Sequence, residues 1–325
     1  MLELSLISIL YTKVNKINQK ERIMKTVLDI HGLSKNFDKQ AILQDLHLTI
    51  REGDIYGLIG KNGAGKTTLI KIITQLLFAD KGTVSLFSSK TENEWSKSLS
   101  RVGSVIESPV AHNHLTAYQN LKYYCMIRHI PNADQVIRET LEYVGLPDTG
   151  KKVFRDFSLG MKQRLGIAIA LLSKPDFLIL DEPINGLDPI GIKEFRLMIQ
   201  RLNQEKGITI LISSHILSEL YLLANRFGIL DQGKIIREIS KAEFETLSED
   251  YIVLKTADQE KACQVLKEQI QLQFKVVNPE NEIHIFGQEQ DVKQILKELT
   301  LADVAIDEIY YARQNLEEYF TQLVQ

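Results

Sequence analysis

Cysteine is scarce in this chain of 325 residues. The two cysteines, Cys125 and Cys263, are far apart and fit neither a metal-binding nor a redox spacing. This usage predicts a protein of a reducing, cytoplasmic compartment.

Long apolar runs are missing as well. No stretch approaches the roughly 20 residues that a membrane-spanning helix needs, so the chain is not expected to form a membrane channel by itself. Hydrophobic residues make up 44% and charged residues 25% of the sequence, proportions that indicate an ordinary globular protein. The length allows two domains and a large core.

The last quarter of the chain has few basic residues. Residues 242–325 carry 17 acidic and seven basic side chains, a net charge of −10, whereas the whole chain carries −3. Because an acidic surface repels nucleic-acid phosphates, we expect no nucleic-acid partner for this part.

Residues 1–23 combine a mostly apolar start with four basic residues between positions 13 and 22. A secretory signal has its positive charges before the apolar stretch, so this order does not predict one. A helix lying on a membrane surface is one interpretation. The favoured one is an extension outside the fold or an upstream start codon, because residues 24–30 read as a plausible first strand.

The chain is organised around a glycine-rich segment that follows a short apolar run, Ile55–Ile59. It matches G-x-x-x-x-G-K-[ST], a loop whose backbone amides surround a polyphosphate at the start of a helix. A lysine of such a loop bridges the β- and γ-phosphates, and the hydroxyl after it binds Mg²⁺. The candidate residues are Gly60, Asn62, Gly63, Ala64, Gly65, Lys66, Thr67 and Thr68.

Two further apolar runs end in polar residues that suit phosphate chemistry. The run Phe177–Leu180 is followed by Asp181 and Glu182. An aspartate at the end of a strand next to a phosphate loop holds Mg²⁺, and the neighbouring glutamate polarises the attacking water. The run 208–212 leads to His215, whose ring could contact a γ-phosphate or that water, although a lone histidine is more often structural.

The segment 157–164, which contains Ser158 and Gly160, opens an unusually apolar helix expected at Leu165–Leu172. A serine cap and a glycine at a helix start can bind an anion, but many helices begin in this way and bind nothing.

These segments, in this order, resemble the nucleotide-binding subunit of ATP-binding-cassette (ABC) transporters over residues 26–240. The resemblance implies that Phe37 stacks on the adenine and that Glu182, His215 and Lys66 are catalytic. It also implies a homodimer, in which Ser158 and Gly160 act on the partner's nucleotide and Asp188, in Gly186-Leu187-Asp188-Pro189, lies in the loop that crosses the dimer.

One position departs from the common pattern. Most cassettes carry a glutamine that touches Mg²⁺ and faces the membrane partner, whereas this chain has Glu107. That glutamate and the segment from Ser158 are similar to the subgroup that serves bacitracin resistance and lantibiotic self-immunity. The resemblance therefore adds Glu107 to Thr67 and Asp181 as a metal-binding candidate.

The expected fold class is α/β, a P-loop cassette with a mixed sheet and a helical subdomain at about residues 109–172. We expect the cassette at 24–241 and a small α+β domain at 242–325, in the order β-α-β-β-α-β with a last helix from Asn315 to Val324.

The resemblance implies an ATPase that uses ATP and Mg²⁺ and drives an exporter through a separate membrane permease, held at the inner face of the membrane. Peptide antibiotics are the predicted cargo. Export of another drug or a lipid, or a cytosolic regulatory switch, remains an alternative.

Overall fold

The computed structural model describes residues 25–38, 40–89, 92–247, 250–277, 281–286 and 291–313. The chain divides between Ser240 and Lys241 into two compact units, here called the large unit and the small unit. The predicted N-terminal extension and the predicted last helix lie outside the described residues. So does Asn278-Pro279, where the sequence favours a turn between two strands. None of the described helices is long and apolar enough to cross a membrane.

A six-stranded sheet, ordered β5-β6-β7-β3-β8-β9, forms the centre of the large unit. Neighbouring strands are parallel from β5 to β8, and only β9 is antiparallel to its neighbour. Strands β3, β6 and β7 are buried along their whole length. Burial on both faces accounts for the apolar sequences of β3 and β6, whereas β7 also buries the polar Thr209, Ser213 and Ser214. The strands are β3 (Ile55–Ile59), β5 (Val102–Val105), β6 (Phe177–Asp181), β7 (Thr209–Ser214), β8 (Arg226–Asp231) and β9 (Lys234–Ser240).

A second, antiparallel sheet has the order β2-β1-β4. Its strands are β1 (Thr26–Phe37), β2 (Gln40–Arg51) and β4 (Lys81–Leu86). Helix α2 (Lys66–Ile73) contributes Leu69, Ile70 and Ile73 to one core shared with both sheets. This core packs α2, and therefore holds the loop before it, against strands of both sheets.

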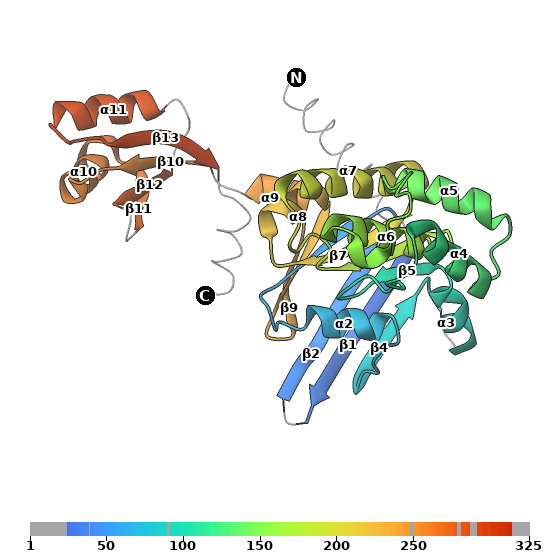
Figure 1. Cartoon of the computed structure of the whole chain (residues 1–325). Helices are drawn as coiled ribbons and strands as arrows, with labels where there is room; N and C mark the ends of the chain where they lie inside the picture. The colour runs from blue at the N-terminus through green and yellow to red at the C-terminus, as the bar shows by residue number, and fades with distance from the viewer. Residues whose placement is uncertain are drawn as a thin grey trace, which may run out of the picture. The chain divides into compact units, whose positions relative to one another are not determined.

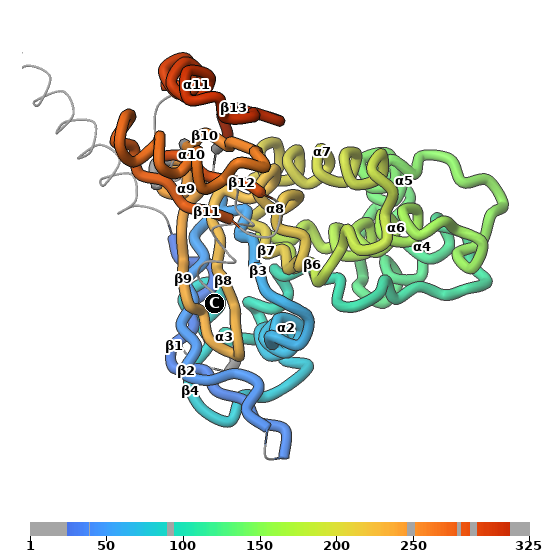
Figure 2. The backbone as a smooth tube through the Cα atoms, turned by 90° about the vertical axis from the view of Figure 1, so that its left-hand side faces the viewer, coloured from blue at the N-terminus to red at the C-terminus, as the bar shows by residue number. Residues whose placement is uncertain are grey.

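The predicted helical region is inserted between β5 and β6. It holds α4 (Ala117–Ile127), α5 (Ala133–Tyr143), a 3-10 turn (Phe154–Asp156) and α6 (Leu159–Leu171). Figures 1 and 2 both show these helices gathered at one end of the large unit, away from β1, β2 and β4. The remaining helices of the unit are α3 (Glu92–Leu99), α7 (Pro189–Lys206) and α8 (Leu217–Leu223).

The small unit is an antiparallel sheet, ordered β11-β12-β10-β13, with its own apolar core. Ile252 and Leu254 of β10 pair with Ile285 and Ile283 of β12, and these four side chains are fully buried. The unit comprises α9 (Lys241–Leu247), β10 (Asp250–Lys255), α10 (Gln259–Val265) with a π turn (Leu266–Ile270), β11 (Gln273–Val277), β12 (Glu282–Phe286), α11 (Asp291–Leu301) and β13 (Glu308–Arg313).

The sequence pattern also predicts a turn at residues 36–39, no helix in the polar segment before Ser100 and a last strand from Val304 to Tyr310, and the structure differs at each of these places. The turn expected at residues 36–39 is shorter, because β1 continues to Phe37. The polar segment before Ser100 forms helix α3, which the sequence pattern did not predict. The last described strand begins at Glu308 rather than at Val304, which packs in the small-unit core instead.

Candidate active site

The loop between β3 and α2 depends on glycine at both of its ends. A Cβ atom at Gly60 would lie 2.6 Å from the carbonyl oxygen of Leu230. Gly65, the N-cap of α2, has φ +110°, a conformation that side chains disfavour. Between them Asn62 and Gly63 are exposed and Ala64 is buried, and Thr68 follows half-buried in α2. The loop thus presents the free N–H groups at the start of α2, where an anion binds.

Lys66 is the first residue of α2, and its ammonium group is turned back into the loop. Its Nζ donates hydrogen bonds to the carbonyl oxygens of Gly60 at 2.6 Å and Lys61 at 3.2 Å. The same atom forms an ion pair with Glu182 Oε1 at 3.1 Å. The lysine is only 5% exposed. Burial of its charge would be energetically unfavourable without these partners.

Asp181 lies at the carboxyl end of β6 and is almost fully buried. Thr67 Oγ1 donates to Asp181 Oδ2 at 2.8 Å, and Ser213 Oγ donates to Asp181 Oδ1 at 2.6 Å. Hydroxyl and carboxylate oxygens are ligands that Mg²⁺ prefers. The ion usually takes one or two of them from the protein, together with phosphate oxygens. The pair Thr67–Asp181 fits that chemistry. Within the described residues no group of three or more His, Cys, Asp or Glu could hold a metal alone.

Glu182 and His215 meet beside this pair. His215 Nδ1 lies 2.9 Å from Glu182 Oε2. Since an ionised carboxylate can only accept, this contact requires a proton on Nδ1 of the histidine. The backbone of Glu182 is left-handed, with φ +48°, and its N–H donates to Ser213 Oγ at 2.9 Å. The carboxylate is thereby shared between a lysine and a histidine.

Ser158, Gly160 and Asp188 come together at a second place. Ser158 Oγ accepts from the N–H of Met161 at 3.3 Å and caps α6, while Asp188 Oδ1 accepts from the N–H of Gly191 at 2.7 Å and caps α7. The two helix starts border one cavity of about 430 Å³, which all three predicted residues line. Neither Lys66 nor Glu182 lines this cavity.

Phe37 is the last residue of β1 and is 45% exposed. The ammonium of Lys35 lies 5.5 Å from the centre of its ring. The aromatic face is therefore accessible, as stacking on a base requires.

Glu107 follows β5 and has φ +59°. Its Oε1 accepts from Lys71 Nζ at 2.6 Å. In the structure this glutamate is therefore bound to a lysine of α2 and not to Thr67 or Asp181, although it leaves the sheet at the same edge.

Two residues of this region escaped the sequence reasoning. Ser213 bonds to both Asp181 and Glu182, and Lys71 pairs with Glu107. The sequence does carry a weak signal for Ser213, since the run that ends β7 becomes polar there. Nothing in the sequence marks Lys71 beyond its place one turn after Thr67.

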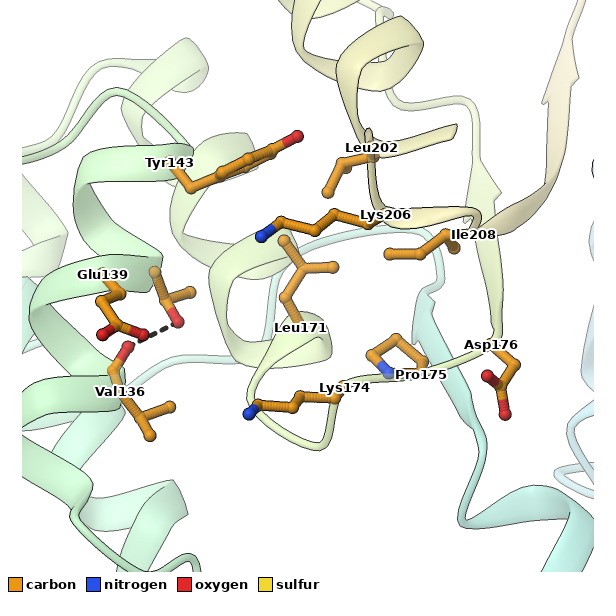
Figure 3. A pocket seen from close by; sticks show the side chains of 11 residues that line it. Val136, Glu139, Tyr143, Leu171, Lys174, Pro175, Asp176, Leu202, Lys206 and Ile208 are labelled. Carbon is orange, nitrogen blue, oxygen red and sulfur yellow. Dashed lines mark hydrogen bonds between the residues drawn. The ribbon is translucent and has the colours of Figure 1, made fainter. Parts of the chain in front are cut away.

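Another cavity, of about 360 Å³, lies at the opposite edge of the sheet (Figure 3). It is bordered by the residues before β6 and β7 and by α5, and Lys206 extends beneath the ring of Tyr143. Burial, and then the hydrogen bond to Glu205, raise the pKa of Tyr143 to about 12. The phosphate loop follows the other end of the parallel strands, so this cavity belongs to a different face.

Comparison with known proteins shows to which family this chain belongs. The ABC transporter family matches residues 43–185. The bacitracin transport ATP-binding protein BcrA of Enterococcus faecalis is 39% identical over 302 residues, which cover 93% of this chain and 97% of that protein. This chain belongs to the ABC transporter ATP-binding proteins. It is accordingly an ATP-binding subunit and an ATPase.

Two more similarities complete the comparison. The lantibiotic transport ATP-binding protein SrtF of Streptococcus pyogenes is 45% identical over 224 residues, 69% of this chain and 95% of that protein. A solved structure of an ATP-binding subunit of an ABC transporter is 30% identical, with a TM-score of 0.58, over 66% of this chain and 90% of that chain. The ABC subunit therefore has the α/β cassette fold predicted from its motifs.

Proposed function

We propose that this ABC subunit hydrolyses Mg²⁺-ATP to drive export of a peptide antibiotic of the bacitracin or lantibiotic type through a separate membrane permease. The observation that carries the proposal is the Lys66–Glu182–His215 arrangement beside Thr67 and Asp181, in a chain similar to BcrA and SrtF. Glu107 and the segment from Ser158 support the same subgroup.

In this proposal each residue has one task. Lys66 binds the β- and γ-phosphates, and Thr67 and Asp181 hold Mg²⁺, which neutralises charge on the phosphates when bound. Glu182 accepts a proton from the attacking water or orients it. His215 keeps the Glu182 carboxylate in place through Nδ1 and faces the γ-phosphate through Nε2.

A second copy of the chain is part of the proposal. Ser158, Gly160 and Asp188 line their own cavity at two helix starts, apart from the Lys66 group. In a head-to-tail homodimer they would complete the nucleotide site of the partner. The partner's nucleotide would then be the anion that the helix start at Ser158 is suited to bind.

The surface for the permease is assigned to the helical region. Val110 is 76% exposed, Met126 69% and Tyr123 41%, and the hydroxyl of Tyr124 donates to the carbonyl of Val110 at 2.9 Å. Exposed apolar side chains gathered in this way mark a protein contact. Through the permease the subunit would lie at the inner face of the membrane.

The test is capture of partners from native membranes with tagged Glu182→Gln protein held with ATP. Losing the general base should reduce turnover about 10²- to 10⁴-fold and trap the ATP-bound dimer. A multi-span permease should co-purify with this variant through the helical region. Lys66→Ala, which cannot hold the phosphates, should lose the ATP-trapped dimer.

Two results would contradict the proposal. Sustained hydrolysis by Glu182→Gln would remove the assignment of the base. A soluble dimer that retains no membrane protein would favour the cytosolic switch, and a permease whose loss leaves resistance to peptide antibiotics unchanged would favour another drug or a lipid as cargo.

A further inference from the structure

Lys71 and Glu107 form an ion pair between two elements of the large unit. Lys71 is in the last turn of α2 and Glu107 is in the loop after β5, and Lys71 Nζ lies 2.6 Å from Glu107 Oε1. The left-handed backbone of Glu107, φ +59°, is disfavoured for a glutamate. The ion pair therefore holds the carboxylate in a place that the backbone alone does not prefer.

The pair lies next to the predicted metal ligands. Lys71 is four residues after Thr67, so both side chains project from the same face of α2. Strand β5 runs parallel to β6 with Val105 opposite Leu180, so Glu107 leaves its strand at the edge where Asp181 ends β6. Thr67 is hydrogen-bonded to Asp181 there. The ion pair thus borders the oxygen atoms that would hold Mg²⁺.

A carboxylate at this edge needs a counter-ion more than an amide would. Asp181 and Glu182 already place two carboxylates there, and ATP adds a triphosphate. A further unpaired carboxylate would be repelled by all of them. The ammonium of Lys71 offsets that charge while using only Oε1. Among the contacts of the described residues, Oε2 of Glu107 has no hydrogen bond or ion pair, so it remains open to a metal or its water.

We propose that Lys71 is a positioning residue for Glu107: it holds the carboxylate through Oε1 and so leaves Oε2 available to the Mg²⁺ of bound ATP. A glutamine at position 107 carries no charge and would not need the lysine. The ion pair therefore explains how a glutamate can stand at this position. The inference rests on the proposed assignment of Glu107 to the metal site.

The test is a double-mutant cycle on nucleotide binding, read without hydrolysis. All proteins carry Glu182→Gln, and binding of a fluorescent ATP analogue is measured as Mg²⁺ is raised. Lys71→Met should raise the Mg²⁺ concentration for half-saturation about threefold to fivefold, the range of a partly exposed ion pair. In the Glu107→Gln background the same substitution should change that concentration by less than about 1.5-fold.

Two controls separate positioning from general damage. Lys71→Arg keeps the charge and should restore the parental Mg²⁺ dependence. Lys122→Met removes a lysine that pairs with Asp134 in the helical region, and it should leave the Mg²⁺ dependence unchanged. Where Lys71→Met does not fold, Lys71→Gln, which keeps a hydrogen-bonding group without the charge, replaces it in the same cycle.

An equal effect of Lys71→Met in both backgrounds, or no effect in either, would overturn the inference, because Lys71 would then not act through Glu107. Failure of the Glu182→Gln parent to bind the analogue at any Mg²⁺ concentration would instead remove the nucleotide site itself. The two failures are therefore distinguishable in one set of titrations.

Discussion

At the scale of single residues, Glu182 is held by contacts from three parts of the chain. Its carboxylate faces Lys66 at 3.1 Å and His215 at 2.9 Å, and its N–H is bound to Ser213 at 2.9 Å. A left-handed backbone costs a non-glycine residue about 1–2 kcal/mol, and such strain persists only where neighbouring contacts outweigh it. Such strain is expected where the orientation of a carboxylate is fixed for its role in a site.

Ser213 is the contact that links Glu182 to Asp181. The change Ser213→Ala removes the partner of the Glu182 N–H and of Asp181 Oδ1, both in the buried part of the site. We expect the free energy of unfolding to fall by about 1–3 kcal/mol. We also expect kcat to fall about tenfold, because Glu182 would lose a hydrogen bond that positions it. A tenfold loss corresponds to an activation barrier higher by roughly 1.4 kcal/mol. Steady-state ATP hydrolysis and denaturant unfolding measure the two effects.

Ser214 provides the matched control for this prediction. It is the next residue of β7, is also fully buried, and its hydroxyl accepts from the N–H of Ile216 at 3.0 Å. Ser214→Ala should lower stability without the tenfold loss of kcat. Equal losses of kcat in both variants would show that Ser213 acts only through stability.

At the scale of elements, Asp80 ties the end of β1 to the start of β4. Its carboxylate accepts from the N–H of Asn36 at 2.7 Å and from Lys35 Nζ at 2.8 Å. The hydrogen bond from Lys35, followed by that from Asn36, lowers the pKa of Asp80 below its ordinary value. Because Phe37 is the next residue, this connection also sets where the proposed adenine-stacking ring stands.

The depressed pKa of Asp80 predicts how its contribution varies with pH. A carboxyl group with a lowered folded-state pKa stabilises the fold above its unfolded pKa, near 3.8, and loses that contribution as pH falls through the folded value. Asp80→Asn should therefore melt at a lower temperature than the parent at pH 7, and the difference should shrink below about pH 4. Thermal unfolding by circular dichroism across this range measures it. A difference independent of pH would contradict the role of the charge.

The elements show what the sequence could predict. The apolar runs before Asp181 and His215 predicted buried strands, and parallel strands bring their carboxyl ends to one edge, so these residues were expected near the phosphate loop. The end of β1 was not predictable, because Asp80, 44 residues away, supports Asn36 in the strand. Lys71 was missed for the same reason, because its partner Glu107 lies 36 residues away. The polar end of β7 is only a weak signal for Ser213, because the partner that gives this serine its place, Asp181, lies 32 residues away.

At the scale of the whole molecule, each of the two units has an apolar core of its own among the described residues. One lies around α2 and the two sheets of the large unit, and the other lies between β10, β12, α10 and α11 of the small unit. Every predicted site residue belongs to the large unit. SrtF aligns over 224 residues that make up 95% of its own length, so that relative has no room for a second unit of this size.

This division predicts that the large unit binds nucleotide without the small unit. A chain that ends at Ser240 keeps β9, the last strand of the six-stranded sheet, and all residues of the site. Its affinity for Mg²⁺-ATP should stay within about twofold of the full chain, a difference of about 0.4 kcal/mol. Equilibrium binding of a fluorescent ATP analogue to both proteins measures it.

A point variant keeps this last prediction testable where the shortened chain does not express. Ile285 is fully buried in the small unit, so Ile285→Ala should reduce the stability of that unit by about 2–5 kcal/mol. Because Ile285 contributes to the small-unit core alone, nucleotide affinity should not change. A loss of affinity in either protein would mean that the small unit supports the nucleotide site. Unchanged affinity, with weaker dimer formation in the presence of ATP, would instead assign the small unit to holding two copies together.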